Sequence, residues 1–212
     1  MRYPLLAASF FLVVSSPAWP QSPPTPAPSA SPPTVGLRGV IERIAPDHES
    51  LDLRAADGQE KTLLLSRDAK VARAVPAKLT DVKPGVYVGV ASLSAGDAGP
   101  QKALEIHIFP ESMRGVGEGS RPFDLAPGSA MTNGAVGARV ERVDGPEIIV
   151  AYAGGEQTIA VDKSTPVVAL EAGGLGDLTI GASIVARGSP ADGGAYKVAR
   201  IVVGVEGVKP PM

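Results

Sequence analysis

His107 is the residue whose type and neighbours most directly suggest chemistry. It alternates with Glu105 in a run expected to form a strand, so the two side chains share one face. Glu111 follows closely, and Met113 and Met131 approach the same face if the chain between them folds back. Imidazole, thioether and carboxylate groups are ligands for copper or zinc. Glu105, His107 and Glu111 are therefore a candidate metal site, and a solvated strand face is the alternative.

The segment 110–134 concentrates side chains that are common at binding surfaces. It holds Met113, Arg114, Arg121 and Phe123, and arginine and aromatic residues are enriched at the energetic centres of interfaces. A connection of this length is usually functional or disordered, and its mixed apolar and charged composition argues against simple disorder. We predict that these four residues contact a binding partner.

Two interpretations of this connector remain open. We expect an ordered strap anchored by Phe109, Phe123 and Leu125, which either lines a binding surface or only joins two domains. The glycines between 115 and 119 lack the preceding strand, following helix and lysine of a phosphate loop, and Pro122 argues against a helix. We therefore do not expect phosphate binding by this loop.

Hydrolytic chemistry has little support. A serine triad needs a base, and Ser112 near His107 lacks the pattern of a nucleophile elbow. The 22 acidic residues single out no facing pair for a glycosidase. With no cysteine in the chain, thiolate chemistry and disulfides are excluded. We expect a non-catalytic protein with no cofactor other than a possible metal ion.

The composition also opposes nucleic-acid binding. Single-stranded nucleic acid is held by a basic groove with stacking aromatic side chains. This chain is only 4% aromatic and has a formal net charge of −2, so it provides neither feature in quantity.

The elements that must position these residues come from a repeat. A shift of 96 residues superimposes Glu60, Thr62, Val71, Leu79, Asp81 and Gly85 on Glu156, Thr158, Val167, Leu175, Asp177 and Gly181. Small insertions align Glu42-Arg43-Ile44 with Glu141-Arg142-Val143, and Ile106 with Ile201. The fold is therefore predicted to be one small β module used twice.

Short alternating apolar runs separated by glycine-rich turns predict strands throughout 35–204, and no segment has a sustained helical stripe. The leucines at 79 and 175 are the exception, since each is expected to begin a single helical turn that caps a barrel end. Asp81 and Asp177 then have a turn or capping role rather than a catalytic one. Gly85 and Gly181 are expected where a side chain does not fit.

Each repeat reads as strand, turn, strand, "T-L/I", strand, "L-x-D-x-x-x-G-x-x-V/I" and a last strand. This pattern resembles a small OB-like β-barrel domain of unknown function, found in bacterial exported proteins and often repeated in tandem. The resemblance implies an all-β fold of two tandem OB-like barrels, at 35–109 and 135–204, joined by a long ordered connector at 110–134. A tail follows at 205–212. The resemblance implies no activity.

The N-terminus predicts export. Residues 1–18 read as a signal peptide, with Arg2, an apolar run and a small-residue cleavage site, and the run is too short for a bilayer of about 30 Å. A retained N-terminal anchor is the alternative. Residues 19–34 form a proline-rich linker. We expect a periplasmic or extracellular protein with no transmembrane segment after cleavage.

Together these features predict a non-catalytic periplasmic or surface adaptor that binds an envelope protein or another envelope component through the connector face. The alternative is a small-ligand or metal (copper or zinc) binding protein that uses the cleft between the barrels.

Overall fold

The computed structural model describes residues 34–94, 99–142 and 145–210, and its fold is all-β as expected. The predicted signal peptide and residues 19–33 of the predicted linker lie outside the described residues. The helical elements among these described residues are 3-10 turns of three residues each.

The elements of the first repeat and the connector are β1 (Val35–Ile44), β2 (Ser50–Ala55), β3 (Glu60–Pro76), η1 (Leu79–Asp81), β4 (Tyr87–Leu93), β5 (Gln101–Ile108), η3 (Glu111–Met113) and β6 (Gly119–Pro122). Those that follow are β7 (Ser129–Val140), β8 (Glu147–Tyr152), β9 (Gly155–Ala160), β10 (Val167–Ala172), η4 (Leu175–Asp177), β11 (Ser183–Pro190), η5 (Asp192–Gly194) and β12 (Tyr196–Gly204).

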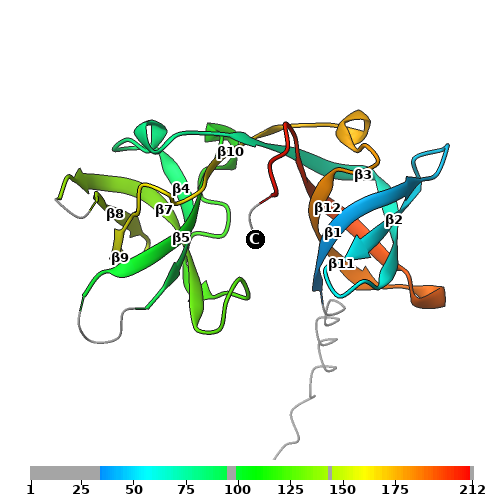
Figure 1. Cartoon of the computed structure of the whole chain (residues 1–212), viewed down its shortest axis with the longest axis horizontal. Helices are drawn as coiled ribbons and strands as arrows, with labels where there is room; N and C mark the ends of the chain where they lie inside the picture. The colour runs from blue at the N-terminus through cyan, green and yellow to red at the C-terminus, as the bar shows by residue number, and fades with distance from the viewer. Residues whose placement is uncertain (1–33, 95–98, 143–144, 211–212) are drawn as a thin grey trace, which may run out of the picture. The chain divides into compact units, whose positions relative to one another are not determined.

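Strands β1, β2, β3, β12 and β11 form a closed five-stranded barrel, here called barrel A (Figure 1). The first three strands are an antiparallel meander, and β11 pairs with β1. Parallel pairing of β12 with β3 closes the ring. This strand order is loosely consistent with an OB-like barrel, which is a five-stranded Greek-key barrel.

Strands β5, β4, β7, β8 and β9 form a second ring of pairings, here called ring B. Antiparallel pairs join all neighbours except β5 and β9, which are parallel over two residue pairs, Gln101 with Ile159 and Lys102 with Ala160. Barrel A has an equivalent parallel contact between β12 and β3. There, Tyr196 pairs with Leu63, and Lys197 pairs with Leu64.

Each ring combines strands from both predicted repeats. Barrel A takes β1–β3 from the first repeat and β11–β12 from the second, and ring B takes β4–β5 from the first and β7–β9 from the second. The expected tandem arrangement, in which 35–109 and 135–204 each close on themselves, therefore differs from the observed pairing. The exchange occurs after β3 and after β10, where the chain leaves one set of strands for the other.

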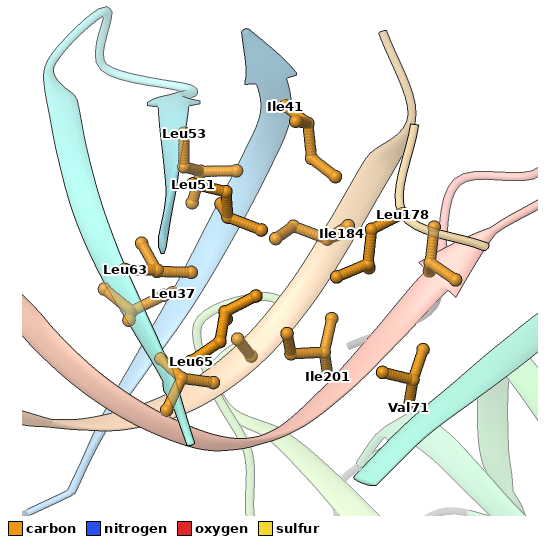
Figure 2. Packing of buried hydrophobic residues seen from close by; sticks show 13 residues of the cluster. Leu37, Ile41, Leu51, Leu53, Leu63, Leu65, Val71, Leu178, Ile184 and Ile201 are labelled. Carbon is orange, nitrogen blue, oxygen red and sulfur yellow. The ribbon is translucent and has the colours of Figure 1, made fainter. Parts of the chain in front are cut away.

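Two separate apolar clusters match the two sets of strands. The cluster of barrel A is built from leucine, isoleucine and valine side chains that point inward from all five strands (Figure 2). Leu53 and Leu63 are fully buried there, as Val90 and Ile148 are in the cluster of ring B. The inward residues alternate with outward ones, as period-two strands require.

The predicted helical turns are confirmed, and each packs on the core of a ring that contains strands of both predicted repeats. Leu175 of η4 packs on the core of barrel A, and Leu79 of η1 packs on the core of ring B. Asp81 accepts a hydrogen bond from the Lys78 backbone N–H (2.9 Å), and Asp177 accepts one from Gly174 (2.8 Å). The capping role of these carboxylates is confirmed.

The structure corrects two expectations from the alignment of the repeats: the reason for the glycines at 85 and 181, and the match of Glu42 with Glu141. Gly85 and Gly181 have φ of 86° and 88°, and an added Cβ would meet open space, so backbone conformation rather than crowding requires glycine there. The β-bulges at Ile41/Arg43 and Val136/Ala138 align Ile41 with Val136. The pairing of Glu42 with Glu141 is therefore wrong.

Candidate ligand-binding site

The connector folds back onto the strands. Its β6 pairs with the first half of β7, so the last part of the predicted connector is already a strand of ring B. Phe109 packs against the ring of Tyr87, with 5.6 Å between centroids. Phe123 is half-buried, but Leu125 is exposed and is not the anchor that the sequence suggested.

The Phe123 region of the connector is tied to β1 of barrel A. Nη2 of Arg38 donates to Oδ1 of Asp124 at 2.7 Å, and the Arg38 guanidinium lies 6.0 Å from the centre of the Phe123 ring. The hydrogen bond from Arg38 is the main reason that the pKa of Asp124 is lowered. These contacts hold the Phe123 region of the connector against barrel A.

Arg114 ties the connector to the strands of ring B and to Glu111 of its own segment. Its Nη2 donates to Oε2 of Glu111 (2.8 Å) and to the carbonyl of Gly85 (2.9 Å), and its guanidinium lies 5.7 Å from the centre of the Tyr87 ring. The hydrogen bond from Arg114 lowers the pKa of Glu111. Arg114 thus holds the connector in place. Of the predicted partner-binding residues, Arg114 has the side chain most fully engaged in contacts within the protein.

His107 is buried and does not lie on a solvated face. Its side chain is 2% exposed, and Nε2 lies 3.0 Å from Oε1 of Glu105, which is itself largely buried. Glu111 is instead exposed beside Arg114. In the part of the chain that the structure describes, no three His, Asp or Glu side chains are grouped to hold a metal ion. The predicted Glu105–His107–Glu111 triad is therefore not assembled.

His107 lines a cavity of about 190 Å³ between the connector and the outer faces of β10, β11 and β12. The apolar part of its lining includes Phe109, Met113, Phe123, Met131, Leu170 and Val202. Its polar side chains are those of His107, Asn133, Arg121, Arg187 and Arg200.

This cavity continues at both ends. A neighbouring cavity of about 360 Å³ shares Phe123 and Arg187 with it, and another of about 340 Å³ shares Met113 and Arg200. The three cavities adjoin through these shared residues, and together we call them the connector groove.

The arginines of the groove differ from the rest of the described chain. The described arginines with a carboxylate at ion-pair distance are Arg38, Arg43, Arg54, Arg67, Arg73, Arg114, Arg139 and Arg142. Among the described residues, only Arg121, Arg187 and Arg200 lack such a partner, and all three line the central cavity. Arg121 donates to the carbonyl of Gly117, at 2.6 Å.

Two of these arginines face one another. Arg187 of β11 is the direct cross-strand partner of Arg200 of β12, and Arg200 is in register with Lys70 of β3. Like charges directly opposite on a sheet are destabilising. Asp124 lines the neighbouring cavity at one end of this row, and Glu171 lines the one at the other end. The groove therefore has a row of positive charges at its centre, formed by arginines without an ion-pair partner among the described residues.

The cavity also holds an unsatisfied polar atom. Asn133 is 4% exposed, and its Nδ2 donates to the carbonyl of Val116 (3.1 Å), whereas its Oδ1 has no hydrogen-bond partner. The central cavity is lined by no aspartate or glutamate of the described chain. An anion with an apolar body suits this lining. A metal cation does not, although Met113 and Met131 meet His107 here as predicted.

Sequence reasoning therefore found part of the site. Met113, Arg121 and Phe123 line the groove together, whereas Arg114 does not. Arg187 and Arg200 were missed. Their signal was present, because each is an exposed charge on a strand whose inner face is apolar. Arg187 is the only charge of β11, and Arg200 shares β12 with Lys197. Only the fold shows that these outer faces meet the connector.

The fold and the groove define an all-β protein containing a small closed barrel, with an arginine-lined groove under its connector. Comparison of the chain with protein-family models, curated proteins and solved structures finds no match, and thus no enzyme or nucleic-acid-binding family. Within the described residues, no helix has both the length and the apolar character needed to span a membrane.

Proposed function

We propose that this protein is a non-catalytic binding protein of the bacterial cell envelope, and that the connector groove is its binding site. One observation carries the proposal. The three arginines without a carboxylate partner, in the described chain, converge on one cavity that no described carboxylate lines. Guanidinium groups without a carboxylate partner favour the binding of an anion, and these three side chains are exposed, so an anion can reach them.

The lining supports recognition rather than turnover. Guanidinium groups remain protonated, so they cannot act as bases. No serine, threonine or tyrosine side chain of the described chain lines the central cavity with His107, and His107 is held by Glu105. The groove thus provides positive charge and apolar surface without a nucleophile beside the imidazole.

The envelope location follows from the predicted signal peptide at 1–18 and from the absence of cysteine. A periplasmic or extracellular protein meets lipids, peptidoglycan fragments and envelope proteins, and many of these are anionic. The location is tested separately, by fractionating cells that express the full chain.

A photo-crosslinking amino acid at position 123 tests the groove directly. Phe123 lines two of its cavities, and benzoylphenylalanine keeps its aromatic ring. The matched control carries the same group at Arg67, whose side chain is 91% exposed on β3. After irradiation in exporting bacterial cells, intact-mass analysis should show a defined adduct for position 123 only. Absence of an adduct, or equal adducts at both positions, contradicts the proposal.

An adaptor function is the second candidate, and exposed apolar side chains on the connector favour it. Val116 is 38% exposed and Leu125 is 37% exposed, close in sequence to Arg121. A protein partner would cover these two side chains and place an acidic group near Arg121. In the crosslinking experiment, an adduct of protein mass at position 123 would select this function.

A further inference from the structure

We infer that the connector groove binds an amphipathic anion, a single carboxylate or phosphate head group on an unbranched apolar chain. The inference rests on the proposed function and names the ligand class for the same site.

The head-group site is the row formed by Arg187 and Arg200. Because these residues are direct cross-strand partners, their Cα atoms lie about 4.5–5.5 Å apart, and one anionic group can accept hydrogen bonds from both. Arg121 lines the same cavity from the connector. Neutralising the row also removes the like-charge repulsion of the empty site.

The apolar body has a continuous path. Phe109, Met113, Met131 and Leu170 line the central cavity, and Met113 also lines the adjoining cavity of about 340 Å³. Methionine side chains are flexible and polarizable, so they adapt to a chain of variable length. A compact inorganic anion would leave this apolar lining unused.

The alternatives fit less well. A cation would be repelled by the three guanidinium groups that line the central cavity without a carboxylate partner among the described residues. A sugar phosphate would need several neutral hydrogen-bonding groups, whereas the polar side chains of the described residues that line the central cavity are, beside the arginines, those of Asn133 and His107. An alkyl anion uses both the positive row and the apolar path.

The experiment measures melting temperature and calorimetric affinity for a panel in which head group and chain vary separately. Decanoate and decyl phosphate are compared with decyl maltoside, decyltrimethylammonium, acetate and inorganic phosphate, with all amphiphiles below their micelle concentrations. The two decyl anions should raise the melting temperature by mass action, and the other four should not. Equal binding of the cationic or neutral amphiphile would overturn the inference, as would equal binding of acetate or inorganic phosphate.

Arg187→Gln and Arg200→Gln provide the matched variants, with Arg67→Gln as the control on a paired, exposed arginine. Each groove variant should weaken decanoate about tenfold or more, the equivalent of one charge-assisted hydrogen bond. The ligand-free variants should melt at the same temperature as the parent or higher, because a like-charge contact is removed. Unchanged affinity in both variants would contradict the inference.

The results separate this inference from the proposed function. A groove adduct at position 123 with no response to either decyl anion leaves the binding function standing and rejects the ligand class. Failure of both experiments rejects both. Co-sedimentation with phosphatidylglycerol vesicles, but not with phosphatidylcholine vesicles, would assign the head group to a membrane lipid. Binding of decanoate without vesicle binding would assign it to a free amphiphile.

Discussion

Ala74 of β3 lies directly opposite Leu170 of β10, and these two residues occupy the same position in the two repeats. Their neighbours are arranged symmetrically, with Pro76 opposite Val168 and Ala72 opposite Ala172. Equivalent strands thus cross antiparallel at the point where the repeats exchange partners. Exchange of strands between two copies of a module would give this pattern of pairing.

Cutting the connector should not separate the two repeats. A protease site inserted after Gly115, where an added Cβ would meet open space, allows cleavage of the folded protein. Because barrel A and ring B each contain strands of both repeats, the two fragments should co-elute in native size-exclusion chromatography and separate only in denaturant. Fragments that separate in native buffer would show that each repeat closes on itself.

Two equivalent glycines should resist substitution. A Cβ on Gly39 would lie 2.1 Å from the carbonyl oxygen of Arg54, and one on Gly134 would lie 2.2 Å from that of Ala151. Gly39→Ala and Gly134→Ala should each lower the free energy of unfolding by about 1–3 kcal/mol or more, because backbone must move. Urea unfolding measures this.

Gly137→Ala is the matched control, since the nearest atom to its added Cβ is 3.7 Å away and it lies in the same strand as Gly134. The expectation fails if Gly39→Ala is as stable as Gly137→Ala.

The two capping aspartates should contribute equally, one to each apolar cluster. Asp81→Ala and Asp177→Ala each remove the acceptor for a backbone N–H at the start of a 3-10 turn. Each should cost about 0.5–2 kcal/mol in urea unfolding. Asparagine at the same positions retains an acceptor, so it should cost less. An alanine variant as stable as the parent would refute the capping role.

Asp124 should titrate below its usual range. The Arg38 hydrogen bond lowers its pKa in the folded protein, so the pair stabilises the fold above the unfolded pKa, near 3.9. That contribution is lost as the pH falls through the lower folded value. In a carboxyl-carbon NMR titration, Arg38→Ala should raise the pKa of Asp124. An unchanged pKa would show that this pair does not form in solution.

Local features of the fold were predictable from the sequence. Alternation of apolar residues, turn-forming glycines and the Leu-x-Asp turns act over a few residues, so they predicted the all-β class, the strands and both aspartate caps. The arrangement of Met113, Arg121 and Phe123 on an ordered connector was also partly predictable, because their types are unusual for a simple linker.

Only the tertiary structure decided which strands close which ring. The two predicted repeats carry equivalent strands. The free edges of β1 and β3 can therefore pair with β11 and β12, as observed, or with the equivalent β4 and β5. No local sequence pattern distinguishes these two ways of closing the ring. The groove depends on that choice. Exchange places Arg187 and Arg200, from the end of the chain, against a connector from its middle, and long-range packing alone brings these charges together.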